Sequence, residues 1–493
     1  MRFGPKDTLT EEEVESGLKS VIRDGLTTQT MLTFTGGAFL VAFALKLGAS
    51  NSVIGLIAAI PPLAQLIQIP SVYLIEKIRN RRKIAVYASL IGRMFWLLVA
   101  LIPLLFSIEA GLSFLIIALA LNSIFAGIGG CSWNSWMRDL IPQDRLGSFF
   151  SRRMTLTTAI GIPLSLASAV YIDYWKVTYP ENELQGYSIL FFLGFLAGML
   201  GVYFVSTIPE PRMQPSESNF LKLISQPFKD TNFKNLIMFM GSWNFAVNLA
   251  APFFTVYMLK RLQFDLSIII AFTILSQLTS LAFLRLWGRF TDRFSNKSVL
   301  GVCGPLFMLT ILAWTFTTMP GRYVLTMPLL ILIHIFMGIS TSGVTLASGN
   351  IGLKLAPKGQ ATSYLASNSL INSIMAGIAP ILGGRLADFF AERELEWTLR
   401  YTAPSGDWTI PTLSLQQWDF FFLFAFLIGL YSIHRLAMVK EDGEVEENVV
   451  VQELISEMRR MRNFSTVGGL RQMVQYPFSI IRTSYDEESN EGP

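Results

Sequence analysis

The sequence predicts an all-α polytopic membrane protein with twelve transmembrane helices arranged in two six-helix bundles. Three observations support this fold class. Only 15% of the 493 residues are charged and 52% are apolar, whereas about 25% of an ordinary soluble domain is charged. Twelve apolar stretches are each long enough to cross a bilayer. Finally, several sequence features recur in the second half of the chain at a nearly constant spacing.

The apolar stretches are justified by the thickness of the bilayer. A hydrocarbon core about 30 Å thick requires roughly 20 apolar residues per helical crossing. Because a backbone in lipid must satisfy its own hydrogen bonds, spans of this length are predicted to be helices. The predicted spans cover residues 25 to 47, 52 to 75, 84 to 106, 112 to 137, 154 to 175, 186 to 208, 234 to 258, 266 to 287, 298 to 319, 324 to 350, 364 to 388 and 417 to 439.

The remaining segments divide the chain into five parts. Residues 1–24 form an N-terminal segment, in which Thr10 and Glu13 fit the capping box of a short helix. The acidic run from Glu11 to Glu13 argues against a signal peptide. Residues 25–208 form the first bundle, 209–233 a proline-rich linker, 234–439 the second bundle, and 440–493 a tail whose residues 445–462 suit an amphipathic helix.

The distribution of basic residues predicts the orientation. Counted with the three adjoining residues of each span, the loops that follow the even-numbered spans carry 19 Lys and Arg, whereas the opposite loops carry seven. Basic residues mark the cytoplasmic side of a membrane protein. We therefore expect a protein of the plasma membrane with both termini, the linker and the tail in the cytoplasm.

An internal duplication accounts for the two bundles. Glu76 after span 2 corresponds to Asp292 after span 8, and Pro142 after span 4 corresponds to Pro357 after span 10. Pro163 in span 5 corresponds to Pro380 in span 11. The offset in numbering is nearly the same for all three pairs. A six-helix unit repeated in parallel is one of the arrangements found in membrane transporters.

The loop after span 8 resembles a known family signature. The run from Gly288 to Lys297, Gly-Arg-Phe-Thr-Asp-Arg-Phe-Ser-Asn-Lys, is similar to the signature of the major facilitator superfamily, and its first-half counterpart is degenerate at Val72 and Arg79. The resemblance covers residues 20 to 440. It implies two bundles that rock about a central site and signature loops that latch the bundles at the cytoplasmic face. The gating residues implied in this way are Glu76, Lys77, Asp139, Gly288, Asp292 and Arg293.

The resemblance also implies that spans 1, 4, 7 and 10 line the substrate cavity. Polar residues near the middle of these spans are Asn122, Asn244, Asn248 and His334, with Thr28 in span 1. Trp243 offers a ring for stacking. Each polar group needs a partner in hydrocarbon, so the candidates bind either substrate or a neighbouring helix.

Charged groups inside the spans are few. Arg93 lies about ten residues into span 3, where it either binds an anionic group or extends toward the cytoplasmic face. Every acid from Asp24 to Asp419 is predicted to lie in a loop or near a span end. This placement argues against coupling through a central carboxylate and leaves His334 as a candidate proton carrier, the alternative being a neutral, hydrogen-bonded imidazole.

These features predict a secondary or facilitative transporter that moves a small organic solute by alternating access. The alternative is a non-transporting solute sensor or assembly factor built on the same fold. Sequence motifs of hydrolases, metalloproteases and nucleotide-binding loops are missing, so we expect no enzyme activity, metal or cofactor. The expected partners are a small-molecule substrate and the lipid bilayer. A net charge of +4 gives no reason to expect nucleic acid, and we expect a monomer.

Overall fold

The computed structural model describes residues 4–142, 145–213, 226–318, 321–357, 361–404 and 406–463. Twelve helical spans in these residues are long and apolar enough to cross a membrane, which confirms the predicted number. The first six spans comprise α1 Glu11–Thr35 with α2 Gly37–Lys46, α3 Asn51–Ala64 with α4 Gln68–Ile78, α5 Arg81–Ala100 followed by the short α6 Ile102–Leu105, α7 Ile108–Leu140, α8 Leu146–Thr178 and α9 Glu183–Thr207. The last six are α11 Thr231–Lys260, α12 Leu266–Arg293, α13 Asn296–Ala313, α14 Thr326–Leu355, α15 Ala361–Phe389 and α16 Trp418–Ala437.

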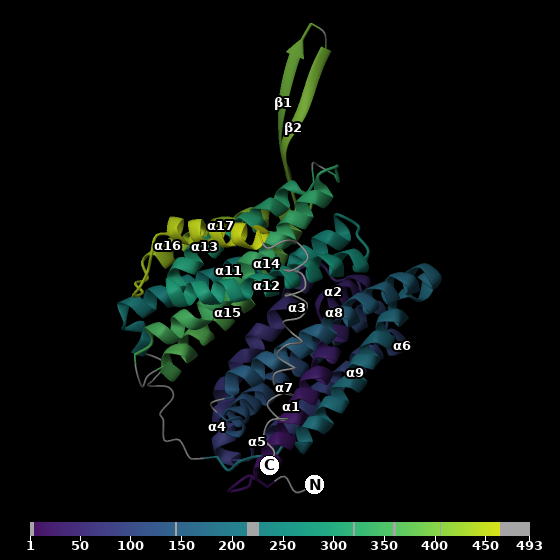
Figure 1. Cartoon of the computed structure of the whole chain (residues 1–493). Coiled ribbons are helices and arrows are strands. Elements are labelled where there is room, and N and C mark those ends of the chain that lie inside the picture. The colour runs from purple at the N-terminus through teal and green to yellow at the C-terminus, as the bar shows by residue number, and fades with distance from the viewer. Residues whose placement is uncertain are drawn as a thin grey trace.

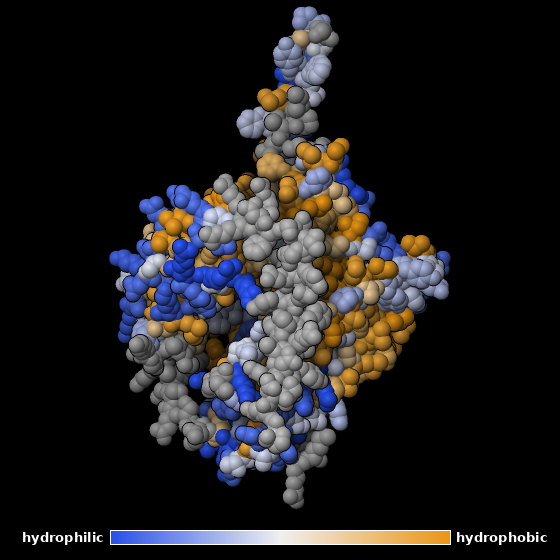
Figure 2. Space-filling model, viewed as in Figure 1, coloured by the Kyte–Doolittle hydropathy of each residue, from blue (hydrophilic) through white to orange (hydrophobic). Residues whose placement is uncertain are grey.

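The spans form two bundles, called here the N-terminal half (α1 to α9) and the C-terminal half (α11 to α16). Within the N-terminal half, α5 packs against α7 and α1 against α9, while α12 packs against α14 and α11 against α16 in the C-terminal half. Apolar side chains of α9, such as Ile189, Leu193 and Leu200, are 42% to 49% exposed. Figure 2 shows this flank as an apolar surface, as expected for contact with lipid.

The ends of the helices define two faces of the molecule. We call the end where α1 begins and α16 ends the terminus face, and the opposite end the hairpin face. The halves contact each other most closely through α3 with α15 and α8 with α12. In Figure 1 the two bundles converge toward the hairpin face and separate toward the terminus face.

Span 1 is longer than predicted and is interrupted. The capping box of Thr10 and Glu13 is confirmed, but the helix that it starts continues into the span rather than ending before it. Asp24 therefore lies inside α1, about 20 Å from its first residue at 1.5 Å per residue, and is buried. The interruption occurs where Gly36 is extended and Gly37 has a φ of 56°.

A β-hairpin between α15 and α16 was not predicted. Its strands, β1 Glu394–Ala403 and β2 Gly406–Gln416, pair in antiparallel fashion with an irregularity between Trp397 and Thr398. The hairpin projects away from the helices in Figure 1. Alternate residues Leu395, Trp397, Leu399 and Tyr401 are 56% to 68% exposed, so one face of β1 is apolar.

The tail contains α17 Glu447–Asn463, which packs against α13. Val450 is completely buried in this contact region. The predicted tail residues after 463, and the linker residues 214–225, lie outside the described part of the chain.

Candidate functional site

A cavity of about 890 Å³ lies between the two halves. The N-terminal half contributes α1, α2, α3 and α8 to its wall, and the C-terminal half contributes α11, α12 and α14. This volume lies within the range of small-molecule sites, roughly 300–1,000 Å³. Because both halves form the wall, a change in their relative position changes access to the cavity.

The cavity wall has no charged side chain among the described residues. Its polar groups are two amides and eight hydroxyls, from Gln29, Thr33, Thr158, Ser165, Thr255, Thr273, Ser276, Gln277, Ser280 and Thr341. The remaining lining is aliphatic, apart from glycine, proline, Phe39 and two methionines. An ion in such a site would lose its hydration without gaining a counter-charge, so the wall favours a neutral solute that forms hydrogen bonds.

Several of these polar groups are free to bind a solute. Thr273 and Ser165 donate to carbonyls of their own helices, which leaves their oxygen lone pairs as acceptors. The Gln29 amide donates to the Thr33 hydroxyl at 3.3 Å. Among the described residues, the Gln277 side chain has no hydrogen-bond partner, and it is exposed to the cavity. Gln277 therefore offers both a donor and an acceptor.

The interruption of span 1 opens onto the same cavity. Gly36, Gly37 and Ala38 line the wall, and no side chain caps the N-terminus of α2. The first N–H groups of a helix have no partner within the helix. The break therefore adds backbone donors to the hydroxyls and amides of the wall.

The predicted asparagines do not line this cavity. The Asn122 amide donates to the Gly92 carbonyl at 2.8 Å and so joins α7 to α5. Asn244 and Asn248 donate to carbonyls of their own helix, those of Met240 and Asn244, both at 2.8 Å. Of the two roles that the sequence leaves open, Asn122 therefore contacts a neighbouring helix in this structure.

His334 and Trp243 are buried in the C-terminal half. The His334 ring stacks on Phe272 at 4.8 Å between centroids, and its Nδ1 lies 2.8 Å from the Leu330 carbonyl oxygen. Its own backbone carbonyl accepts a hydrogen bond from Ser276, so His334 lies directly behind the cavity wall. Trp243 packs against Phe307 and is 6% exposed.

Arg93 and Thr28, two predicted site residues, come together around an acid that was predicted to lie at a span end. Arg93 Nη2 lies 3.6 Å from Asp24 Oδ1 and donates to the Thr28 hydroxyl at 2.9 Å. Thr28 in turn donates to Asp24 Oδ1 at 3.0 Å. Arg153 approaches the other carboxylate oxygen at 3.9 Å. Two guanidinium groups therefore surround one carboxylate inside the N-terminal half, away from the cavity lining.

Glycines of α9 make room for this charge cluster. A Cβ atom at Gly201 would lie 2.3 Å from Arg93 Nη1 and 3.3 Å from Asp24 Oδ1. At Gly198 it would lie 3.3 Å from Arg93 Cδ, and the Gly198 carbonyl accepts from Arg93 Nη1 at 2.6 Å. The Arg93 guanidinium is therefore enclosed against the backbone of α9.

The predicted gating residue Asp139 pairs with Arg81 within the N-terminal half. Arg81 is fully buried and also contacts Glu210, which follows α9. The Glu210 carboxylate accepts from the backbone N–H groups of Arg81 at 2.6 Å and Arg82 at 3.1 Å. This network ties α5, α7 and the end of α9 together, so Asp139 does not bridge the two halves here.

A matching network holds the tail against the C-terminal half. The Glu441 carboxylate accepts from the N–H groups of Asn296 at 3.3 Å and Lys297 at 2.7 Å. These two residues begin α13, as Arg81 and Arg82 begin α5. Lys297 also pairs with Glu444 at 2.7 Å, and this hydrogen bond holds the pKa of Glu444 below its usual value. Glu210 and Glu441 each follow the last span of their half and cap the start of its third span, α5 or α13. The duplication thus includes this contact.

Among the remaining predicted gating residues, Arg293 pairs with Glu453 of α17 at 2.8 Å. Asp292 and Lys77 are exposed, and the described residues offer no side-chain partner to Asp292 or Glu76. A Cβ atom added at Gly288 would lie 3.9 Å from the Leu346 side chain, which belongs to the same half. The signature residues therefore make no contact between the halves in the described part of this structure.

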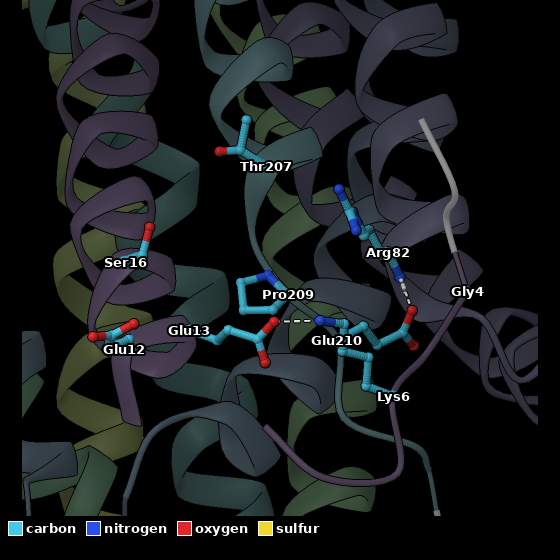
Figure 3. Close-up of a pocket in the computed structure, with 9 residues that line it drawn as sticks. All are labelled: Gly4, Lys6, Glu12, Glu13, Ser16, Arg82, Thr207, Pro209 and Glu210. Carbon is cyan, nitrogen blue, oxygen red and sulfur yellow. Dashed lines mark hydrogen bonds and ion pairs between the residues drawn. The ribbon is translucent and has the colours of Figure 1, made fainter. Parts of the chain in front are cut away.

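A second, smaller cavity of about 400 Å³ lies at the terminus face. Figure 3 shows Lys6 reaching Glu13, and Glu210 accepting from Arg82. Its lining includes three acids, Glu12, Glu13 and Glu210, and two bases, Lys6 and Arg82. The backbone of Lys6 is also hydrogen-bonded to the segment that follows α9, because the Lys6 N–H donates to the Glu210 carbonyl at 2.9 Å. This cavity belongs to the network that fixes Glu210.

Comparisons with known proteins agree with this architecture. The family model described as Major Facilitator Superfamily matches residues 25–380 and 235–479. The chain belongs to the major facilitator superfamily. It is accordingly a membrane transporter by family, as predicted. A comparison with curated protein sequences gives no match.

Solved structures of other superfamily transporters share the fold. A mutant of the nucleoside transporter NupG has a TM-score of 0.62 at 14% identity, covering 87% of this chain and 100% of that one. A bacterial homologue of the iron transporter ferroportin in an inward-facing state has a TM-score of 0.59 at 12% identity, covering 88% and 100%. A bacterial homologue of the human lysosomal transporter Spinster, inward-facing and unoccupied, has a TM-score of 0.55 at 13% identity, covering 87% and 95%. At these identities the likeness concerns the fold.

Proposed function

We propose that this superfamily member carries a small, uncharged, polar organic solute through the 890 Å³ cavity by alternating access. The observation that carries the proposal is the composition of the wall: among the residues that the structure describes, the lining offers ten hydroxyl and amide groups and no charged group. A nucleoside, sugar or polyol matches this wall because its hydroxyl groups replace their hydration with hydrogen bonds. NupG, which has the same fold, is a nucleoside transporter, and nucleosides are therefore tested first.

The same proposal assigns a direction to the structure. The terminus face is the cytoplasmic face because the basic loops lie there. The halves meet at the hairpin face and separate toward the terminus face, as in an inward-facing state. The membrane is proposed to be the plasma membrane, and the functional unit a monomer.

Flux across a liposome membrane tests the proposal. The purified full-length protein is reconstituted, and uptake of labelled nucleosides, sugars and polyols is compared with uptake of organic acids and lipophilic cations. We expect uptake of at least one neutral class and little uptake of the charged classes. Preferential uptake of a charged solute would contradict the assignment, and absence of flux for every class would favour the alternative of a sensor or assembly factor.

A matched pair of glutamine variants tests the site. Gln277→Ala removes an amide that faces the cavity, whereas Gln185→Ala removes an amide that contacts Asn182 away from it. Loss of one hydrogen bond of about 1 kcal/mol weakens binding about fivefold. We expect this increase in KM for Gln277→Ala alone. Equal transport by the two variants would remove Gln277 from the binding site.

A further inference from the structure

Two acids join the halves at the hairpin face, and each caps a helix of the opposite half. Asp388, near the end of α15, accepts from the N–H groups of Asn51 at 3.1 Å and Ser52 at 2.8 Å, which begin α3. The Asn51 side-chain amide adds a third hydrogen bond at 2.9 Å. Asp388 belongs to the C-terminal half and α3 to the N-terminal half.

Asp173 makes the reciprocal contact. It lies near the end of α8 in the N-terminal half and accepts from the N–H groups of Leu266 at 3.1 Å and Ser267 at 2.8 Å, which begin α12. Both carboxylate oxygens are used, as they are in Asp388. Each half therefore supplies one acid and receives one acid.

The two contacts are equivalent in the duplication. The offset in numbering from Asp173 to Asp388 equals the offset from the donor Asn51 to the donor Leu266, and from Ser52 to Ser267. The same offset separates Pro142 from Pro357, one of the pairs that revealed the duplication. The same interaction therefore occurs twice, at positions that correspond in the two halves.

The chemistry of these contacts favours a closed hairpin face. The first N–H groups of a helix have no partner within the helix and carry partial positive charge. A carboxylate forms strong, charge-assisted hydrogen bonds with them. Once the halves separate, each acid remains near the C-terminal end of its own helix, where the partial charge is negative and repels it. Separation therefore breaks both contacts and creates an unfavourable arrangement in each half.

Close backbone packing brings Asp388 to its donors. A Cβ atom at Gly55 would lie 2.1 Å from the Pro380 carbonyl oxygen, and a Cβ at Gly384 would lie 2.4 Å from the Asn51 carbonyl oxygen. The glycines thus allow α3 and α15 to touch along their backbones. The same approach places the start of α3 beside Asp388.

We propose that Asp173 and Asp388 are paired latches that hold the hairpin face closed and must both release when the cavity opens to that face. This inference rests on the proposed alternating access. The signature acid Asp292, by contrast, lies at the terminus face with no side-chain partner among the described residues, so it does not hold the state seen here. Its substitution cannot open the hairpin face.

The test measures the conformational population without any substrate. Spin labels at Val177→Cys and Val324→Cys report the separation of the halves at the hairpin face, because these side chains are 80% and 91% exposed on opposite halves. Cys131 and Cys303 are replaced by alanine to avoid labelling elsewhere. Distances are measured by electron–electron double resonance in lipid nanodiscs for Asp173→Asn, Asp388→Asn and the double variant.

Each asparagine variant is expected to raise the open-to-closed ratio about 5- to 30-fold, because asparagine keeps one accepting oxygen but loses the second oxygen and the charge that the contact uses. The shifts multiply in the double variant, because one opening breaks both contacts. The matched control is Asp265→Asn, which removes the exposed pair with Lys176 across the same interface and shifts the ratio less than about threefold. Asp292→Asn is expected to leave the hairpin face closed.

A second variant approaches one latch from its donor side. Asn51→Pro removes both Asn51 donors to Asp388 while leaving the acid in place. Proline suits the first position of a helix, and the preceding Ser50 is already extended. Asn51→Pro should therefore open the hairpin face as Asp388→Asn does.

The outcomes separate this proposal from the proposed function. Populations that match Asp265→Asn in the asparagine variants and in Asn51→Pro would overturn the latch, even if the protein transports a solute. Populations that shift as expected in a protein that carries nothing in liposomes would support the latch and refute the proposed transport.

Discussion

Removing the buried carboxylate of Asp24 should destabilise the N-terminal half more than removing either arginine beside it. The side chain of Asp24 is 6% exposed, and those of Arg93 and Arg153 are 11% and 24% exposed. Asp24→Asn leaves both guanidinium groups without a counter-charge. Breaking a buried pair in this way costs about 3–5 kcal/mol. At about 2–4 °C per kcal/mol for a unit of this size, the lower bound corresponds to a fall in melting temperature of roughly 6–12 °C.

Arg93→Gln should cost less, about 1.5–3 kcal/mol, because Asp24 retains Arg153 at 3.9 Å and the hydroxyl of Thr28. The double variant should be less destabilised than the sum of the two changes, because it removes both partners. Thermal unfolding of detergent-solubilised protein measures all three. Glu15→Gln, on the same helix as Asp24, breaks only an exposed pair with Arg145; it serves as control and should change stability by less than about 1 kcal/mol. An Asp24→Asn protein as stable as Arg93→Gln, or strictly additive effects, would refute this account of the cluster.

Three further changes test neighbouring features. Gly201→Ala should lower the melting temperature and Gly130→Ala should not, because an added Cβ meets Arg93 at 2.3 Å in the first case and nothing within 4 Å in the second. Gly37→Ala should reduce flux and cost about 1–2 kcal/mol, since its φ of 56° is left-handed; unchanged flux would show that the break in span 1 tolerates strain. Glu441→Gln should cost about 2–3 kcal/mol because its side chain is fully buried against Lys354 and the start of α13. Glu453→Gln, whose partner Arg293 is 62% exposed, should cost less than about 1 kcal/mol, and equal losses in urea or thermal unfolding would contradict this difference.

The fold could be predicted because the bilayer imposes a simple length requirement. Each crossing needs about 20 apolar residues, and the constant offset between the halves indicated the duplication. The hairpin was missed although Leu395, Trp397, Leu399 and Tyr401 alternate with polar residues, the pattern typical of a strand. Length and apolarity predict the spans on either side, and the segment between them is predicted only to connect them.

The site was harder to predict because sequence position gives depth in the membrane but not direction. Asn122 and Asn244 are at the right depth, yet one joins two helices and the other bonds within its own. The cavity wall uses threonine and serine, whose hydroxyls can bond to their own helix and so attract little attention in an apolar span. Asp24 is predicted at a span end because the capping box at Thr10 predicts a separate short helix before the span, whereas the capped helix continues to Thr35.

The lack of charge on the part of the cavity wall that the structure describes has an electrical consequence. A neutral solute that moves through a neutral passage transfers no net charge, so the membrane voltage exerts no force on that step. If transport currents are recorded, their charge must come from a co-transported ion or from displacement of charged groups elsewhere, such as the Asp24, Arg93 and Arg153 cluster inside the N-terminal half.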